Sequence, residues 1–416
     1  QQRVYSLALI TPFPTPMSRT DASHSLRLNL SLLSVVAMWP VRPGRASSFL
    51  LYVSYILAVS AFLFWLGELG TVIRVRHDAK QLLGYVGLLC GHFVSLYKWC
   101  VLAVNRRQLQ RLVDSLNKCM QTEAAAERSE ELHRFTKVAN TRATIMTVFW
   151  MAGAMYVTLY WSITPLLHNG SHEQLSGLHA NETFSHSCCR RFYFLPFGEW
   201  PFLNTRSSPV YELLYTVWAT GSVTHGWIHA SCDCLYLHVI TFISSHFEFL
   251  IAILGLAEQY SELVVCIRHH EHLLSAAKDL NAVFSSVMFM QLFNTLFALC
   301  TFAFDVSTIK PGRGDSGLSS KVGFFAATIF QLYIYCWAGS RLTELSGRVA
   351  EAGYESRWLE NACWRRPVQL LVMRAQKPLK LTGGPFYTIS YETLLAHLQL
   401  SFSYFTVLKN MNGPED

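Results

Sequence analysis

The sequence predicts an all-α, polytopic membrane protein with seven transmembrane helices, and three observations support this fold class. Hydrophobic residues make up 51% of the 416 residues, and only 15% are charged. The mean hydropathy of the chain is positive. The apolar residues also come in blocks of about 20, which is the length that a helix needs to cross roughly 30 Å of hydrocarbon. A soluble protein needs no apolar blocks of that length.

The apolar blocks locate the predicted helices. Seven blocks are long enough to cross a bilayer, and they lie at residues 47–66, 82–104, 143–164, 209–255, 283–304, 322–341 and 391–411. The third is expected to end at Pro165, because proline interrupts a helix. The fourth is twice as long as one crossing, so we expect one long helix that continues into the cytoplasm, with a re-entrant pair as the alternative. Lys98, near the inner end of the second, is expected to reach the interface.

The distribution of basic residues predicts the orientation of these helices. Of the 34 Lys and Arg residues, 23 lie in segments assigned to the cytoplasm and 10 in external segments. By the positive-inside rule, the N-terminus is expected to be cytoplasmic and the C-terminus extracellular. A cleavable signal peptide is not expected, because Pro12, Pro14 and Pro16 interrupt the region where its apolar run would lie.

This topology divides the chain into four parts. Residues 1–46 are expected to form a cytoplasmic N-terminus, and residues 47–340 hold the first six helices with a long external loop at 165–208. Residues 341–385 are basic and amphipathic, so we expect cytoplasmic helices there that extend the membrane helices into an anchor. Residues 386–416 hold the seventh helix and an external C-terminus.

The long external loop carries two sites for N-linked glycosylation. Asn169-Gly-Ser and Asn181-Glu-Thr both match the acceptor sequence, and two matches in one polar loop favour an extracellular position. Asn29-Leu-Ser also matches, but it lies on the predicted cytoplasmic side and is not expected to be modified. Cys188 and Cys189 are adjacent and poorly placed to bond each other, which leaves a free thiol or a disulfide bond to another segment.

The last apolar block has the composition of a pore-lining helix. It is less hydrophobic than the others and contains hydroxyl and amide side chains that lipid does not solvate. Tyr404, Val407 and Met411, at helical spacing, face a common lumen if several copies of this helix meet at one axis. A ring of Val407 and Met411 is then expected to close the pore by dewetting. Ordinary packing within one subunit explains the same stripe, and that alternative stays open.

Other classes of protein fit the sequence less well. The formal net charge of +7 comes from basic residues in loops and not along one helical face, which argues against nucleic-acid binding. The eleven cysteines form no CxxC pair and no zinc-binding spacing. Metal-dependent membrane enzymes need several histidine boxes, so the HHEH run at 269–272 is expected to be a solvated loop, and Asp233 and Glu248 are interpreted as anchor or vestibule charges. No metal site, cofactor or enzymatic activity is predicted.

Four stretches beyond residue 195 carry a family resemblance. They are PFGEWPFLNTRSSPVYELLY (196–215), YCWAGSRLTELSGRVAEAGYESRW (335–358), RAQKPLKLTGGPFYTISYETL (374–394) and SFSYFTVLKN (401–410). In this order they resemble the insect odorant receptor family of ligand-gated cation channels. The resemblance implies four subunits around one central pore, with a cytoplasmic anchor at about residues 235–280 and 341–380.

The resemblance also implies a role for this chain within the channel. The 256–281 connection is short where the family's co-receptor has a longer loop, which implies a tuning subunit that forms a heterotetramer with the co-receptor. The terminal motif of the family, matched on residues 404–408, implies a gate at Val407 and, one turn on, Met411. The implied location is the plasma membrane of an olfactory neuron's dendrite.

An odorant is implied to bind in the outer half of the bundle, between the second, third, fourth and sixth helices. The matching residues are Tyr85, Leu89, His92, Phe93, Gly153, Tyr156, Val157, Tyr160, Tyr215, Trp218, Ser222, Phe325, Thr328, Ile329 and Leu332. Such a lining suits a small, volatile, mostly apolar ligand with one hydrogen-bonding group. His92 is the sharpest candidate, because a histidine in a span needs a partner or a cavity. Ordinary helix packing is the alternative for each residue taken singly.

Two related receptor classes are the alternatives. A gustatory-receptor-like channel is expected to carry a TY-x5-QF pattern in its last helix, and SYFTVLKN does not match it. A G-protein-coupled receptor also has seven helices, but the basic residues favour the opposite orientation, and no DRY-like or NPxxY-like motif occurs at the third or seventh span. The odorant-gated channel is therefore the favoured function.

Overall fold

The computed structural model describes residues 26–36, 38–39, 45–77, 79–121, 128–168, 209–307 and 318–411. Its helices are α2 (Arg27–Val35), α3 (Arg45–Arg74), α4 (Ala79–Val104), α5 (Arg106–Met120), α7 (Ser129–His168), α8 (Val210–Leu256), α9 (Tyr260–Ser307), α10 (Leu318–Glu355), α11 (Arg365–Ala375) and α12 (Tyr391–Met411). Two 3-10 turns, η1 (Arg357–Leu359) and η2 (Ala362–Trp364), precede α11, and an antiparallel pair of strands, β1 (Thr382–Gly383) and β2 (Tyr387–Thr388), precedes α12. Asn169, Asn181, Cys188 and Cys189 lie outside the described residues.

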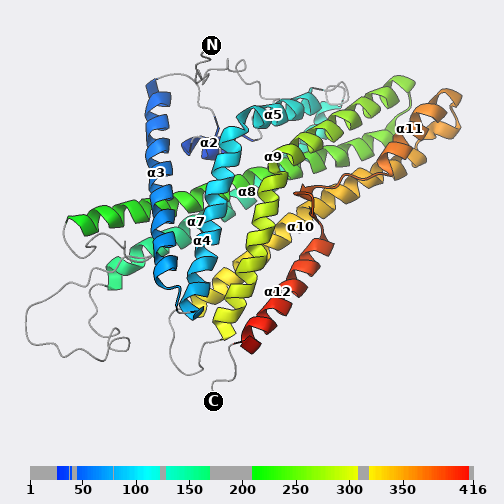
Figure 1. Cartoon of the computed structure of the whole chain (residues 1–416). Coiled ribbons are helices and arrows are strands. Elements are labelled where there is room, and N and C mark those ends of the chain that lie inside the picture. The colour runs from blue at the N-terminus through cyan, green and yellow to red at the C-terminus, as the bar shows by residue number, and fades with distance from the viewer. Residues whose placement is uncertain are drawn as a thin grey trace, which may run out of the picture.

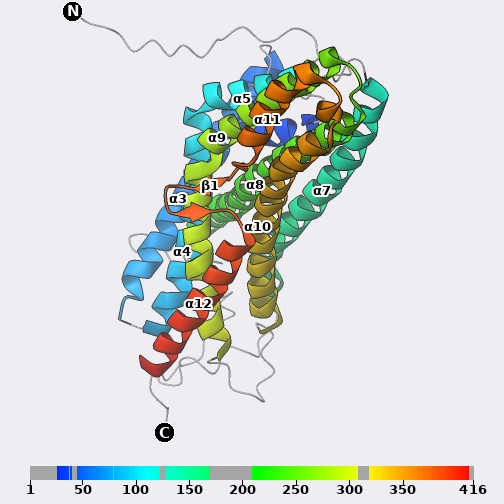
Figure 2. The ribbon, with the colours of Figure 1, turned by 90° about the vertical axis from the view of Figure 1, so that its right-hand side faces the viewer.

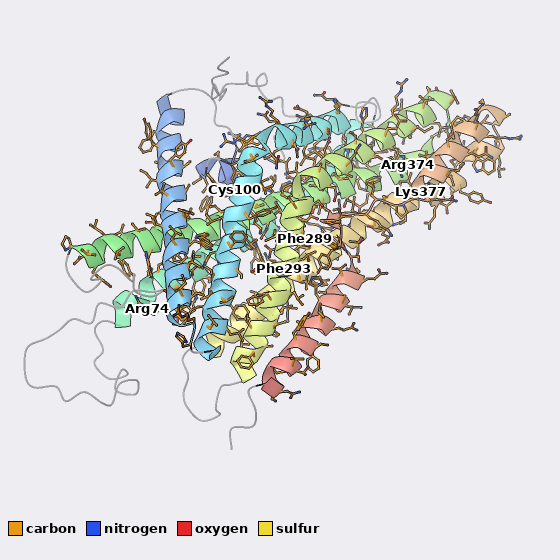
Figure 3. The ribbon with its side chains drawn as sticks, in the orientation of Figure 1. Arg74, Cys100, Phe289, Phe293, Arg374 and Lys377 are labelled. Atoms are coloured by element: carbon orange, nitrogen blue, oxygen red, sulfur yellow. The ribbon has the colours of Figure 1, made fainter. Side chains whose placement is uncertain are left out.

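Six helices in the described part of the chain are long and apolar enough to cross a membrane, namely α3, α4, α7, α8, α9 and α10. The 21-residue α12 is not among them, so the seventh crossing stays a prediction. The helices α5 and α11 lie toward one end of the bundle, and α12 extends toward the other (Figures 1 and 2). Arg374 and Lys377 mark the first end, and Arg74 at the end of α3 lies far from them (Figure 3).

The central element is α8, which runs unbroken for 47 residues. The prediction of one long helix is therefore confirmed, and the re-entrant pair is excluded. Six helices contact α8: α2, α3, α4, α7, α9 and α10. Because neighbours surround it, its side chains are buried on most faces and not along a single stripe.

The third predicted span ends later than expected. α7 continues through Pro165 to His168, so the prediction of an end at Pro165 is wrong. A proline lacks only its own N–H, and near the end of a helix the loss of one bond does not stop the helical backbone. At its other end α7 begins at Ser129, 14 residues before the predicted span at 143–164, so this helix extends beyond its apolar block.

The prediction of a solvated loop at residues 269–272 is also wrong. α9 runs as one helix from Tyr260, so the histidine run lies within it. His269 and His270 are buried, and His269 Nε2 lies 3.3 Å from His246 Nδ1 of α8. The face that carries them packs on α8, which explains why they are not in water. The connection from α8 to α9 is thus only a few residues long.

A buried ion pair joins α4 to α8. Lys98 Nζ lies 2.5 Å from Asp233 Oδ1, and the two side chains are 0% and 1% exposed. The expectation that Lys98 reaches the membrane interface is therefore wrong, because the side chain turns inward to a carboxylate. Asp233 correspondingly belongs to the interior of the bundle and not to a vestibule.

Gln331 extends this contact to α10. Its Nε2 donates to Asp233 Oδ2 at 2.9 Å, and it lies 3.0 Å from His229 Nε2 and 3.1 Å from the Tyr335 hydroxyl. Three helices are thus joined by one polar network. A buried charge in hydrocarbon requires such partners, because isolated it would lose its hydration without compensation.

The short helix α2 is inserted among the longer ones. Asn29 is fully buried; its Nδ2 donates to the Cys234 carbonyl at 3.2 Å, and its Oδ1 accepts from Thr147 at 3.3 Å. The indoles of Trp99 and Trp227 donate to carbonyls at the end of this segment, at 2.8 and 2.9 Å. The acceptor sequence at Asn29 is therefore inaccessible in the folded protein.

The strand pair connects α11 to α12 and makes close backbone contacts. Ile389 N donates to the Leu381 carbonyl at 2.8 Å, and the positive φ of Gly384 (61°) permits the turn between the strands. A Cβ on Gly339 of α10 would lie 2.3 Å from the Ile389 carbonyl oxygen. Ile389, which lies between β2 and α12, therefore packs directly against α10.

The ion pair yields a stability prediction. Asp233→Asn leaves Lys98 buried without a counter-charge, and Lys98→Met leaves Asp233 buried without one. Each variant is expected to destabilise the fold by about 3–5 kcal/mol. Both variants are expected to lower the Tm of the purified protein in detergent, and the double variant Lys98→Met/Asp233→Leu should recover part of the loss. The control is Arg134→Gln, because the Arg134–Glu130 pair is exposed and contributes little. A wild-type Tm for Asp233→Asn would contradict this role.

The α10 glycines provide a second test. Gly339→Ala forces a Cβ against Ile389 and is expected to cost about 1–3 kcal/mol through the displaced backbone. Gly323→Ala on the same helix meets nothing within 4 Å, so its effect should be neutral or slightly stabilising. Protease cleavage between α11 and α12 in the folded protein should increase for the first variant only. Equal cleavage of both variants would show that the contact does not hold the strand pair.

Candidate functional site

Residues predicted to bind ligand on α4 and α8 meet around Phe64 of α3. His92 Nδ1 lies 2.8 Å from Glu68 Oε2, where an imidazole N–H donates to the carboxylate. The centroid of the Phe64 ring is 5.0 Å from that of His92 and 6.2 Å from that of Trp218. The rings of His92 and the buried His225 lie 4.8 Å apart. His92 thus has the partner that a histidine within a span requires.

Three side chains around Phe64 keep a buried polar atom without a hydrogen-bond partner among the described residues. These atoms are Glu68 Oε1, Trp218 Nε1 and His225 Nδ1. His225 Nε2 is 3.0 Å from the Ala61 carbonyl, to which it donates, so His225 Nδ1 is an acceptor. An unpaired buried polar group costs about 1–3 kcal/mol, and in native proteins it marks a place for water or a ligand. The cluster therefore offers two acceptors and one donor to a polar group.

The other predicted residues of α4 and α8 have mixed surroundings. Tyr85 and Leu89 are half-buried, whereas Phe93 is exposed and lies beside Trp65, with 6.1 Å between ring centroids. The Tyr215 hydroxyl donates to a backbone carbonyl of α7. Ser222, one turn beyond Trp218, is buried. Of these residues, Tyr215 packs against the cluster of Phe64, Tyr211 and Trp218.

The predicted residues of α7 lie mainly on a face that points away from α8. Tyr156 and Tyr160 are exposed, and their rings stack with 6.3 Å between centroids. Gly153 is exposed and Val157 is half-buried. Thr158, by contrast, packs against Gly226 of α8. The structure therefore does not bring Tyr156 and Tyr160 into the Phe64 cluster.

The predicted residues of α10 belong to a different cluster. Phe325, Ile329 and Leu332 pack with Leu292 and Leu299 of α9 and with Leu394 and Leu398 of α12. The Thr328 hydroxyl donates to a carbonyl of its own helix at 2.8 Å. This part of the predicted set thus connects α10 to the base of α12 and does not face His92.

α12 has one packed face and one exposed face. Leu394 and Leu398 pack on α9, and the Cys300 thiol of α9 lies 3.6 Å from the Ser401 carbonyl. Tyr404 and Val407 are 52% and 54% exposed. The backbone of Met411 ends the helix. Two of the three residues predicted to line a pore therefore lie on a face that the described part of this subunit leaves uncovered.

The end of the bundle opposite α12 also carries exposed apolar side chains. They are Tyr354 at the end of α10, Leu359 of η1, and Leu370 and Met373 of α11. Phe289 of α9 lies farther along, where its ring contacts Phe386 with 5.8 Å between centroids (Figure 3). An apolar surface of this kind on a helical extension is typical of a contact between protein subunits.

Cysteine and metal chemistry have little support in the described ranges. No group of three or more His, Cys, Asp or Glu side chains that could hold a metal ion occurs there. Burial raises the pKa of the Cys119 thiol in α5 to about 12. The thiol is therefore protonated at neutral pH and is neither a nucleophile nor a metal ligand.

Sequence reasoning missed Glu68 and His225. The predicted first span ends at residue 66, but α3 continues to Arg74, so the Glu68 carboxylate lies within the helix. His225 lies within the long fourth block at 209–255, where hydropathy does not single it out. An acid followed by further apolar residues in the same block is the signal that could have identified Glu68.

Comparison with known proteins places the chain in a family. A family model described as 7tm Odorant receptor matches residues 78–402. Putative odorant receptor 92a of Drosophila melanogaster is 22% identical over 326 residues, which is 76% of each chain. Odorant receptor 10 of Aedes albopictus is 21% identical over 347 residues, covering 79% of this chain and 83% of the relative.

The fold is also found among solved structures. The insect olfactory receptor OR5 from Machilis hrabei in complex with eugenol has a TM-score of 0.78 at 19% identity, with 93% of this chain and 97% of that chain covered. A second structure of the same receptor has a TM-score of 0.77 at 18% identity, with 93% of this chain and 98% of that chain covered. These relatives are receptors and not enzymes. The chain is a multi-pass membrane protein that belongs to the 7tm odorant receptor family.

Proposed function

We propose that this chain is a tuning subunit of an odorant-gated, non-selective cation channel. The observation that carries the proposal is the family match over residues 78–402, because it includes the predicted ligand-site residues of α4, α7, α8 and α10 and the first half of α12. A small volatile ligand binds in the outer half of the bundle and opens a pore lined by α12. The working channel is a heterotetramer with the co-receptor in the plasma membrane of an olfactory neuron's dendrite.

In this proposal α12 is the seventh crossing, the N-terminus is cytoplasmic and the C-terminus is extracellular. The 21 residues of α12 rise about 31 Å as a helix, which matches the hydrocarbon thickness. The exposed positions of Tyr404 and Val407 support a face that meets other subunits or the lumen. A ring of Val407, with Met411 one turn on, closes the pore by excluding water.

The end of the bundle that carries η1 and α11, which we propose as the cytoplasmic anchor, supports the assembly of several subunits. Leu359, Leu370 and Met373 are exposed there although each is strongly apolar. Contact with the same region of neighbouring chains buries them and gains free energy in proportion to the apolar area removed from water. The proposed partner is the co-receptor, whose anchor would meet this one around the pore axis.

The proposed ligand site is centred on His92 and draws on the fifteen predicted residues. Those on α4 and α8 lie nearest the Phe64 cluster, whereas Tyr156 and Tyr160 of α7 are exposed and the α10 members pack toward α12. The support comes from the Phe64 cluster, in which aromatic rings surround unpaired buried polar atoms. Aromatic walls bury an apolar ligand, and Glu68 Oε1 or His225 Nδ1 accepts a hydrogen bond from its single polar group. Glu68 is thereby added to the set that the sequence predicted.

The proposal is tested by recording from oocytes that express this chain with and without an odorant receptor co-receptor. A panel of small volatiles should evoke a cation current only when both chains are present. Surface expression is verified for each condition. Protein at the surface that gives no current but signals through added G proteins would contradict the channel assignment.

The gate is tested in the same recordings. Val407→Ser makes the constriction wettable and is expected to raise the current in the absence of ligand. Val407→Ile keeps the position apolar, so its basal current should stay low. A basal current that is the same for both variants would place the gate elsewhere.

The polar cluster predicts a ligand-dependent effect. Glu68→Gln keeps the shape of the side chain but removes the charge, so ligands with a hydroxyl or amine should lose about tenfold in potency. Ligands without a donor should be unaffected. The control is Glu212→Gln, an exposed acid in the first turn of α8. An equal shift for both kinds of ligand would indicate a structural role for Glu68 instead of direct recognition.

A further inference from the structure

A cavity lies on the opposite half of the bundle from the Phe64 cluster. It has a volume of about 820 Å³ and lies between α7, α8 and α10. None of the fifteen residues of the proposed ligand site lines it. On α8 it is lined from Ile240 to Glu248, which begins 22 residues, or about 33 Å of helix, beyond Trp218. It is therefore separate from the proposed odorant site.

The charged residues of this cavity lie at the ends of two apolar segments. Arg142 directly precedes the apolar run of α7, and Arg341 directly follows the apolar run of α10. Both side chains reach the same cavity although they come from different helices. The two arginines therefore sit at the same depth, at the edge of the hydrocarbon, where phospholipid phosphates lie.

The cavity offers an unpaired cation. Arg341 is paired with Glu248 and lies 5.7 Å from the centroid of the Trp337 ring. Arg134 lies two turns from Arg142 on the same face of α7 and pairs only with the exposed Glu130. Arg142 is exposed and has no hydrogen bond or ion pair with any residue in the described ranges. The lining arginines outnumber the lining acids, Glu131 and Glu248, which favours an anion.

Apart from the hydroxyls of Thr241, Ser244 and Ser245, the remainder of the lining is apolar, and it continues toward the membrane interior. Ile145, Met146 and Trp337 line the side that lies beyond Arg142 and Arg341 in the membrane direction. A smaller cavity of about 60 Å³ shares Met146 and Thr241 with the first and extends along apolar residues such as Phe330 of α10. A free inorganic anion gains nothing from contact with such an apolar extension, whereas an acyl chain can bury its apolar surface there.

We propose that this cavity binds an anionic phospholipid of the cytoplasmic leaflet, with its phosphate on Arg142 and an acyl chain along Met146 and Trp337. The assignment of the leaflet rests on the orientation given under the proposed function. Arginine is suited to this role because its fork of N–H groups matches phosphate oxygens. The cytoplasmic leaflet supplies such lipids, because it is the one enriched in anionic headgroups.

The site is tested by binding and not by current, so its failure is distinguishable from failure of the channel assignment. The purified full chain in neutral detergent is titrated with short-chain phosphatidylinositol bisphosphate, phosphatidylserine and phosphatidylcholine, and bound lipid is counted by native mass spectrometry. The anionic lipids should bind more tightly than phosphatidylcholine. Equal binding of all three lipids would overturn the proposal.

Two variants locate the site. Arg142→Gln is expected to weaken binding of the anionic lipids about tenfold, the loss typical of one charge-assisted contact. The matched control is Lys137→Gln, an exposed cation of the same helix that does not line the cavity, and it should bind as the wild type does. Met146→Trp fills the cavity without changing its charge and should also weaken binding. Equal loss in the Lys137 variant, or none in the other two, would overturn the site.

The headgroup alone distinguishes a lipid from a soluble phosphate. Inositol trisphosphate has the phosphates but no acyl chain, so it should bind at least tenfold more weakly than the matching lipid. Binding of equal strength would show that the cavity recognises a soluble anion, and the phospholipid assignment would be wrong. The Tm of each variant is measured beside its binding, and a Tm equal to that of the wild type confirms that weaker binding does not come from unfolding.

Discussion

Packing against α8 is the interaction on which the rest of the structure depends. A helix in hydrocarbon satisfies its own backbone hydrogen bonds, so side-chain contacts decide where its neighbours lie. Two glycines of α8 allow close approach, because a Cβ on Gly221 would lie 2.6 Å from Phe64 of α3 and one on Gly226 would lie 2.6 Å from Thr158 of α7. Asp233, also on α8, sets the rotation of α4 and α10 through Lys98 and Gln331.

Much of the fold could be predicted from hydropathy, because the length of an apolar block directly gives the length of helix that a bilayer requires. The double-length block became α8, and the last block at 391–411 has the same bounds as α12. The family resemblance comes from four short stretches, of which 196–215 leads into α8 and 401–410 lies within α12. In each case the information is local, so a linear sequence contains it.

What could not be predicted depends on partners that are distant in sequence. Hydropathy predicts that Lys98 reaches the interface because it takes no account of Asp233, the counter-charge 135 residues away. The sequence predicts a solvated loop at His269 for the same reason, since its buried neighbour His246 lies on another helix. On α10, Leu332 fits a stripe toward the ligand site or one toward α12 equally well, and only packing on α9 decides between them.

The insertion of α2 also has a consequence for the order in which the protein is made. The amide of Asn29 has its partner at Cys234, 205 residues later in the chain. At about 5–20 residues per second, the ribosome needs about 10–40 s to supply that partner. During this time α2 is already synthesised but has no site in which to dock. Among the described helices, the first to leave the ribosome is therefore one of the last to reach its final position.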